Sequence, residues 1–223
     1  MRDASNEAAS RDAFDTPALE AVRGELRAAG REAREMASGL EPRRLWWRPA
    51  PDRWSVGECL DHLVLTGEAY LPVLDETIAD GRRRGLHAAG PHRRTLVGRW
   101  LPRLLEPPPG LRVTAPLEIR PRRPELQGSP REAPGPHGSR PAPTAPEGSR
   151  GDPLAAFLEL RSRFRDRLAA ADGLDLGRLR MASPFYWWIR FDLGSAFRII
   201  AAHERRHLWQ ARQVVETEGF PAA

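Results

Sequence analysis

Two histidines near the C-terminus are spaced for chemistry. His203 and His207 are four residues apart, so on an α-helix both imidazoles project from the same face. At about 100° per residue that face is otherwise apolar, and it carries Ala196, Ile199, Ile200, Ala211 and Val214. A buried imidazole needs a polar partner. The pair either binds one metal ion or forms hydrogen bonds with neighbouring helices, and we favour the metal ion.

Two imidazoles do not complete a metal site, because a third ligand is required. The remaining histidines are His62, His87, His92 and His137. His62 falls within a predicted helix, on the flank of its apolar stripe. The other three fall in a Pro- and Arg-rich segment between predicted helices.

The sequence from His203 to His207 also reads H-E-x-x-H, the zinc-peptidase signature, in which Glu204 would be the general base. Such enzymes usually take their third ligand downstream, and no histidine follows His207. Gln210 and Gln213 occupy the positions that the extended signature requires to be Gly and His. A strand before the helix is also missing, so we rank a zinc peptidase as the less favoured alternative.

Four segments carry the apolar periodicity and end signals of helices. The first follows Thr16 and Pro17 and ends before Gly39, and the second begins at Ser55 with a capping box to Glu58. Pro72 is expected to kink or interrupt the second helix. The third and fourth are predicted at 153–172 and about 195–218. No segment alternates like a strand over a useful length, so the sequence predicts an all-α four-helix bundle.

A long crossover separates the second and third helices. It looks partly helical at Leu96–Leu105 and irregular at 107–125. Residues 126–150 are rich in Pro, Gly and Arg and poor in large apolar side chains, so we predict a disordered insertion there. We expect one domain over 15–223, with a disordered N-terminus at 1–14.

Composition limits the classes of function. All 35 basic residues are Arg, and the net charge is +5. Residues 81–150 carry 14 Arg against 5 acidic residues, whereas the rest carries 21 against 25, so the charge does not indicate a nucleic-acid partner. No apolar run is long enough for a membrane span, and without a secretory signal we expect a cytoplasmic protein. The one cysteine, Cys59, excludes an internal disulfide framework.

Two segments resemble one known family. Residues 54–63 (WSVGECLDHL) are similar to the start of the second helix of the DinB-like (DinB/YfiT) superfamily, and residues 201–210 (AAHERRHLWQ) to its last helix. The resemblance covers about 15–80 and 152–217. It implies an up-down-down-up bundle that binds zinc or nickel through His62, His203 and His207, and frequent homodimers. The long crossover is a departure from the family core.

The resemblance also implies candidate activities. Three neutral histidines leave a position open for water or substrate, as in catalytic sites. The better-understood members of the family look like transferases that use low-molecular-weight thiols, or isomerases that use them, and others are presumed hydrolases. We therefore expect a metal-dependent transferase or hydrolase that activates a thiol or water and acts on a small molecule. The alternative is a non-catalytic, metal-stabilised bundle that works through dimerisation.

Three further residues have assigned or discounted roles. Glu204 borders the pair and is a candidate for proton transfer or for orienting a ligand. Arg206 borders the apolar stripe and is a candidate for binding a substrate carboxylate. Cys59 lies one turn before His62, and we interpret it as core filling.

Overall fold

The structure, a computed structural model, describes residues 16–88, 95–107, 119–121 and 152–222. The fold is mostly helical, as predicted, with a small two-stranded sheet. The long helices are α2 (Pro17–Ala37), α4 (Val56–Arg83), α6 (Pro153–Ala171) and α7 (Leu193–Val215). Two shorter helices, α3 (Pro42–Leu45) and α5 (Leu96–Leu105), and strands β1 (Arg180–Ala182) and β2 (Arg190–Asp192) complete it. The predicted insertion at 126–150 and the predicted disordered N-terminus at 1–14 lie outside the described residues.

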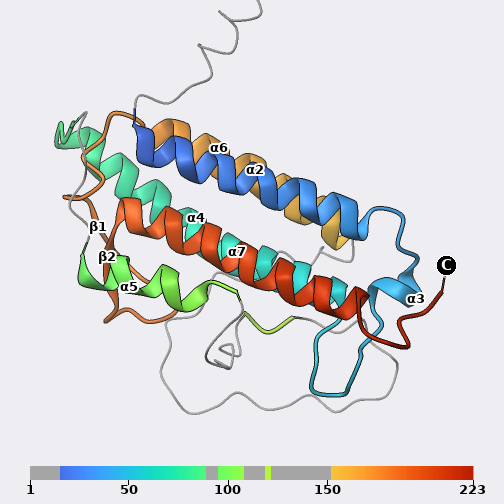
Figure 1. The fold of residues 1–223 in the computed structure, drawn as a ribbon. Helices are drawn as coiled ribbons and strands as arrows, with labels where there is room; N and C mark the ends of the chain where they lie inside the picture. Colours follow the sequence, from blue (N-terminus) through green and yellow to red (C-terminus); the bar gives the residue numbers. More distant parts are fainter. Residues whose placement is uncertain (1–15, 89–94, 108–118, 122–151, 223) are drawn as a thin grey trace, which may run out of the picture.

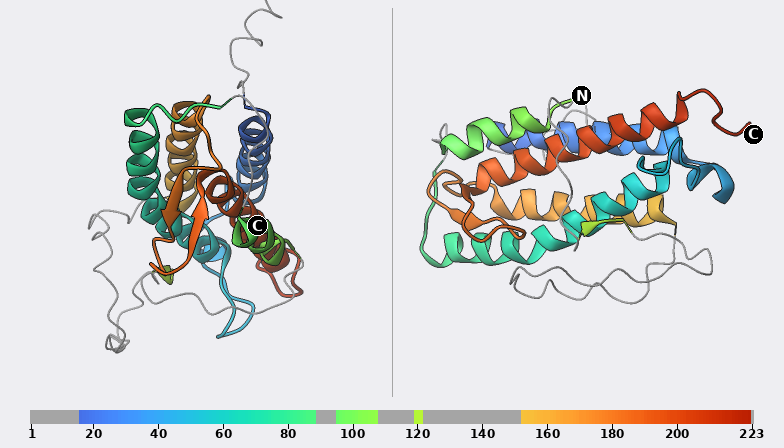
Figure 2. Two further views of the ribbon diagram at one scale, coloured as in Figure 1. Left: turned by 90° about the vertical axis from the view of Figure 1, so that its left-hand side faces the viewer. Right: turned by 90° about the horizontal axis from the view of Figure 1, so that it is seen from below.

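The four long helices lie side by side, with α2 and α7 running in one direction and α4 and α6 in the other (Figures 1 and 2). Contacts between helices fix these directions. The backbone N–H of Thr16, before α2, donates to Asp172 at the end of α6, so α2 and α6 are antiparallel. Arg212 near the end of α7 pairs with Glu32 in the second half of α2, so these two helices are parallel.

Local sequence signals explain the helix ends. Helix α2 begins at Pro17 after Thr16, as predicted, and Gly39 follows it with a φ of 79°, which glycine adopts without strain. Helix α4 begins with the predicted capping box. The Ser55 hydroxyl accepts from the Glu58 N–H at 3.1 Å, and the Glu58 carboxylate accepts from the Ser55 N–H at 2.9 Å.

The expectation for Pro72 is wrong in part, because α4 continues from Val56 to Arg83 without interruption. Pro72 lies on the exposed face of α4, whereas Leu71 and Leu74 on the other face are buried. Its missing N–H therefore faces the solvent side, and packing of the buried face keeps the helix continuous. Helix α7 spans Leu193–Val215 and begins and ends two or three residues before the predicted positions.

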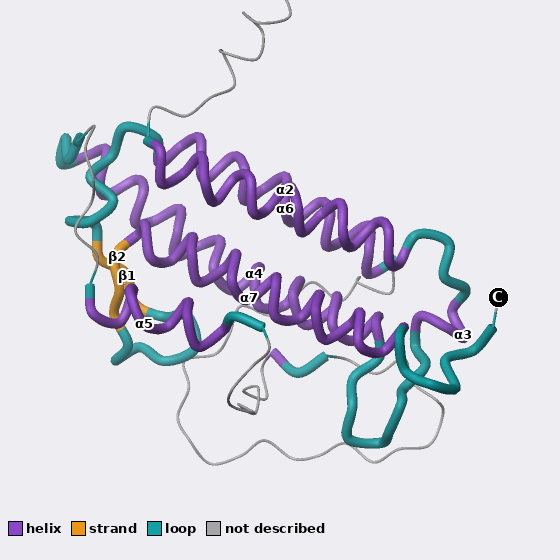
Figure 3. The backbone as a smooth tube through the Cα atoms, in the orientation of Figure 1, coloured by secondary structure: helices purple, strands orange, loops and turns teal. Residues whose placement is uncertain are grey.

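The sequence predicted no strands, and this prediction is wrong, because the structure contains two short ones. Strands β1 and β2 form an antiparallel hairpin (Figure 3) in which Met181 is paired with Phe191. Both of these side chains are buried. Each strand has three residues, too few for an alternating pattern to be recognised. The hairpin closes one end of the bundle, where α5 packs on α7 and β2 (Figure 2).

One buried carboxylate joins β2, α5 and α7. Asp192 is 0 % exposed. It caps α7 by accepting from the Ser195 N–H at 2.8 Å and from the Ser195 hydroxyl. It also accepts from the Thr95 N–H and hydroxyl at 2.9 and 3.0 Å, immediately before α5. Asp192 therefore fixes where α5 lies.

No helix within the described ranges is long and apolar enough to cross a lipid bilayer.

Replacing Asp192 with Ala should lower the free energy of unfolding by about 3 kcal/mol. The substitution leaves donors on buried Ser195 and half-buried Thr95 without their acceptor, and a buried group without a partner costs about 1–3 kcal/mol. The measurement is chemical denaturation followed by circular dichroism. The control is Asp80→Ala, which removes ion pairs with the exposed side chains of Arg83 and Arg84, and which should cost under about 1 kcal/mol. Equal losses in both variants would contradict the role of Asp192.

Candidate metal centre

The structure brings His62, His203 and His207 together. The three side chains each offer a ring nitrogen, and these ligand atoms lie within 4.8 Å of one another. His62 comes from the first half of α4, and the other two come from consecutive turns of α7. His62 and His207 are buried, whereas His203 is half-buried. The sequence placed His62 on the flank of its stripe, but the side chain is only 2 % exposed.

Hydrogen bonds orient two of the three rings. His62 Nδ1 lies 2.6 Å from the carbonyl oxygen of Ile119, and His207 Nδ1 lies 3.1 Å from the side-chain oxygen of Gln210. A carbonyl oxygen only accepts, so each Nδ1 is the protonated nitrogen that donates. The Nε2 atoms of both rings then carry lone pairs. A neutral imidazole with one nitrogen so bound is the form that ligates metal ions.

The spacing of the nitrogens fits a shared metal ion. His62 Nε2 and His203 Nε2 are 3.2 Å apart. Two ligands at zinc–nitrogen distances of about 2.0–2.1 Å in tetrahedral geometry are separated by about 3.3 Å. Imidazole is also a good ligand for several divalent first-row metals, among them zinc, nickel, copper and iron. The residues present therefore fit a divalent ion.

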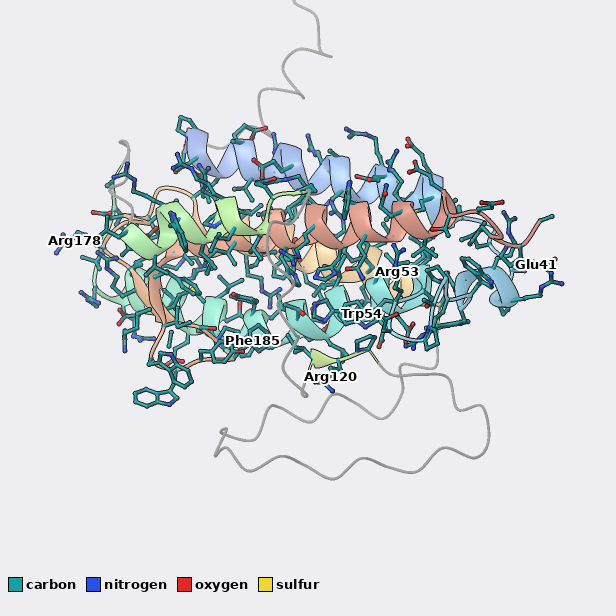
Figure 4. The ribbon with its side chains drawn as sticks, turned by 60° about the horizontal axis from the view of Figure 1, so that its bottom comes forward. Glu41, Arg53, Trp54, Arg120, Arg178 and Phe185 are labelled. Atoms are coloured by element: carbon teal, nitrogen blue, oxygen red, sulfur yellow. The ribbon has the colours of Figure 1, made fainter. Side chains whose placement is uncertain are left out.

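Trp54 covers the histidines from the loop before α4. Its ring stacks on His207 with centroids 5.5 Å apart and lies 4.8 Å from the ring of His62. The loop is tied down because Arg48 forms an ion pair with Glu58, the same carboxylate that completes the capping box. Figure 4 shows Trp54 and Arg120, the latter on the 119–121 segment, beside the half of α4 that carries His62.

A cavity of about 200 Å³ adjoins His203. It lies between α4, α6 and α7, and α5 and the hairpin close its other sides. The lining is largely apolar and includes Leu63, Tyr70, Leu105, Phe164, Phe185 and Ile199. His203 and Glu204 provide two of its few polar side chains. A small apolar molecule in this cavity would lie next to the metal-ligating atoms.

The chain matches the family model of the DinB superfamily over residues 25–211. This match covers most of the chain and both histidine-bearing helices. The protein belongs to the DinB superfamily. No curated protein and no solved structure matches the chain significantly. The family and the three neighbouring histidines together make this DinB-superfamily member a helical protein with a candidate metal site.

Glu204 is placed to act on the cavity, but it also has a structural partner. Its carboxylate is 3 % exposed and pairs with Arg161 of α6 at 2.8 Å, while Oε1 has no hydrogen-bond partner among the described residues. Burial raises the pKa of Glu204 to about 7, and Arg161 opposes this increase.

Arg206 and Cys59, the other two residues considered in the sequence analysis, lie away from the cavity. Arg206 lies towards α5, with an N–H 3.4 Å from the Leu104 carbonyl, and does not line the cavity. Cys59 is fully buried in the core, as predicted, and burial raises the pKa of its thiol.

Several contributors to this site carry no local signal in the sequence. The Ile119 carbonyl comes from the crossover, where no periodicity marks it. Arg161 pairs with Glu204 between α6 and α7, and only the fold brings them together. Trp54 stacks on His207 from the loop before α4, where no local pattern in the sequence marks it as a neighbour of the histidines.

The burial of the histidines sets their charge in the metal-free protein. Burial lowers the pKa of His62 to about 4 and that of His203 to about 3, and it lowers the pKa of His207 well below its usual value. Repulsion among the rings and from Arg206 adds to the effect on His203 and His207. All three imidazoles are therefore neutral at pH 7 and have the form that binds a metal ion.

Alanine at His62, His203 or His207 should weaken metal binding at least tenfold, since even groups that only support ligands are worth 10–100-fold. The measurement is elemental analysis of protein purified without a metal-affinity tag, followed by competition with a chelator. His87→Ala is the matched control, because His87 is exposed and lies outside the cluster. Full zinc or nickel content in the triple-alanine variant would show that the assignment is wrong.

Metal-free protein should lose stability as the pH falls below about 6.5. The unfolded chain protonates each histidine near pH 6.5, whereas the folded pKa values are lower, so the unfolded state binds more protons in this range. Glu204 has the opposite effect, because its raised pKa adds stability as the pH falls from 7 towards 4.5. With three histidines against one glutamate, we expect a net loss of about 3 kcal/mol between pH 7 and 5.

The measurement is chemical denaturation of chelator-treated protein at pH 7, 6 and 5. The His203→Asn/His207→Asn double variant is the comparison, and it should lose most of the pH dependence. A wild-type stability that rises from pH 7 to pH 5 would contradict the burial of neutral imidazoles.

Proposed function

We propose that this protein is a metal-dependent enzyme that activates a low-molecular-weight thiol or water for attack on a small apolar electrophile. The observation that carries the proposal is the position of His203, which belongs to the histidine cluster and also lines the apolar cavity. A divalent ion held by His62, His203 and His207 lowers the pKa of coordinated water or thiol and so supplies a nucleophile near neutral pH. Of the two nucleophiles we favour the thiol, because the DinB-like relatives of known activity use one.

The cavity supports an apolar substrate. Its walls are built from aliphatic and aromatic side chains on five elements, with Leu63, Leu105 and Phe164 on three of them. Binding of an apolar group is favoured by roughly 25 cal/mol per Å² of surface removed from water. Phe185 and Tyr186 on the hairpin also line the cavity, whereas Trp187 and Trp188 are 76 % and 62 % exposed. Of the four consecutive aromatic residues at 185–188, two therefore face the cavity and two face solvent.

Residues around the three histidines have separate roles in this proposal. Trp54 covers the outer side of His62 and His207 and limits access of water there. Ile119 and Gln210 hold the protons on Nδ1 of His62 and His207, so that Nε2 of each ring stays available. The unpartnered Oε1 of Glu204 holds or accepts a proton beside the cavity, while Arg161 fixes the other oxygen.

We expect protein loaded with zinc or nickel to consume a small thiol in the presence of electrophiles, and His203→Ala and chelator to abolish this activity. The assay follows loss of free thiol against a panel of apolar electrophiles, with ester hydrolysis measured in parallel for the water route. Leu105→Trp should raise KM more for bulky substrates than for small ones, because Leu105 lines the cavity. Equal rates for loaded wild type and His203→Ala would sink the enzymatic proposal.

A second candidate function is a metal-stabilised bundle that acts as a homodimer. Exposed large apolar side chains support it: Leu96 and Trp100 on α5, and Trp187 and Trp188 on the hairpin, are 62–82 % exposed. Helix α5 and the hairpin lie at the same end of the bundle (Figure 1). Large exposed apolar surface commonly marks a protein–protein contact.

If this end mediates dimerisation, Trp187→Ser/Trp188→Ser should convert a dimer into a monomer without altering helicity or metal content. Sedimentation equilibrium over a range of protein concentrations measures the change. Trp47→Ser is a control at the other end of the bundle, where Trp47 packs on Phe220. A monomeric wild type would rule out the dimeric function.

A further inference from the structure

Ion pairs between arginine and a carboxylate join two pairs of long helices, whereas the interface between α2 and α6 differs. Between α2 and α7, Glu25 and Glu32 of α2 pair with Arg205 and Arg212 of α7. Between α4 and α6, acidic residues of α4 pair with Arg163 and Arg167 of α6. In both interfaces, arginine of one helix meets a carboxylate of the other.

The interface between α2 and α6 instead brings arginine against arginine. These helices lie side by side (Figure 1) and enclose a groove of about 460 Å³. Six arginines line it and no acidic residue does, the six being Arg23, Arg27, Arg31 and Arg34 from α2 and Arg161 and Arg165 from α6. The floor is apolar and includes Leu26, Leu158 and Leu168.

Some of these guanidinium groups contact carboxylates outside the groove. Arg23 pairs with Glu20, Arg161 with Glu204, and Arg165 approaches Asp166 at 3.9 Å.

No acidic partner is recorded for the side chains of Arg31 and Arg34 within the part of the chain that the structure describes, and both are exposed. The proximity of Arg34 also acts, after burial, to lower the pKa of Arg161. The charged side chains that line the groove are therefore all positive.

A glycine on α2 lets one of these arginines cross the groove. A Cβ atom at Gly30 would lie 2.8 Å from Nε of Arg161, so any larger residue would displace the guanidinium group. Arg161 thus lies against the backbone of α2, where it pairs with Glu204 and feels the charge of Arg34. Gly30 therefore leaves room for the guanidinium group of Arg161 close to Arg34, which carries the same charge.

We propose that this groove binds a small molecule with a polyvalent phosphate group, such as a diphosphate or triphosphate. The guanidinium fork pairs with phosphate oxygens through two parallel hydrogen bonds. A ligand with several negative charges would neutralise Arg31, Arg34 and Arg165 together, and its organic part would cover the leucine floor. The volume lies within the range of small-molecule sites, about 300–1,000 Å³, which favours such a ligand over a nucleic-acid duplex. The groove lies outside the cavity and the histidine cluster, so the proposal does not depend on the enzymatic one.

The test is isothermal titration of the full-length protein with inorganic pyrophosphate and tripolyphosphate at pH 7.5, without and with 150 mM NaCl. We expect one site per chain, tighter binding of tripolyphosphate, and at least tenfold weaker binding by Arg31→Gln/Arg34→Gln. The control is Arg83→Gln/Arg84→Gln, which removes the same charge from the exposed end of α4 and should bind like wild type. Circular dichroism and metal content should be unchanged in both variants.

Four results would overturn the proposal. Equal loss of affinity in the two double variants would show that binding follows net charge and not the groove. Equal binding of citrate would show that the groove does not select phosphate. Tighter binding of a short RNA or DNA oligonucleotide than of tripolyphosphate, abolished by Arg31→Gln/Arg34→Gln, would assign the groove to nucleic acid. No detectable binding of either phosphate at low salt would refute the site itself.

Discussion

Three neutral imidazoles must share one small volume at the interface of α4 and α7, and the surrounding structure serves this constraint. Unpartnered polar groups in such a place are costly. Here His62 has the Ile119 carbonyl as partner, His207 has the Gln210 side chain, and His203 lies against the ring of His62. The antiparallel arrangement of α4 and α7 brings the beginning of one helix to the second half of the other, so that His62 meets His203 and His207. The capping box and Arg48 set the first turn of α4 and the loop that places Trp54 over the rings.

The same arrangement explains why a cavity lies beside the histidines. His203 is one turn before His207 on α7, and it is the half-buried member of the cluster. Beyond it α6, α5 and the hairpin provide the other walls of the cavity. Asp192 links these walls to the start of α7 by accepting from Thr95 and Ser195. A single carboxylate at one end of the bundle thus controls the shape of the volume next to the histidines.

The sequence predicted those features that are written in a local pattern. The i, i+4 pair on an apolar stripe identified His203 and His207, and Ser55 with Glu58 located the start of α4. His62 required the resemblance to a family as well, because one histidine on the flank of a helix is a weak signal. The Ile119 carbonyl and the Arg161–Glu204 pair could not be predicted, since each contact joins residues far apart in the chain that meet only in the folded protein. The hairpin could not be predicted because its strands of three residues are too short to show an alternating pattern.

The distance along the chain between His62 and His203 has a consequence for the unfolded protein. These residues are 141 positions apart, and the chain has a single cysteine, so no internal disulfide can join its two halves. An ion held by His62, His203 and His207 would take that role as a reversible cross-link. Because the entropy of closing a loop grows only with the logarithm of its length, the strength of such a cross-link hardly depends on how many residues lie between α4 and α6. The crossover can therefore change in length among relatives while the cross-link keeps its effect.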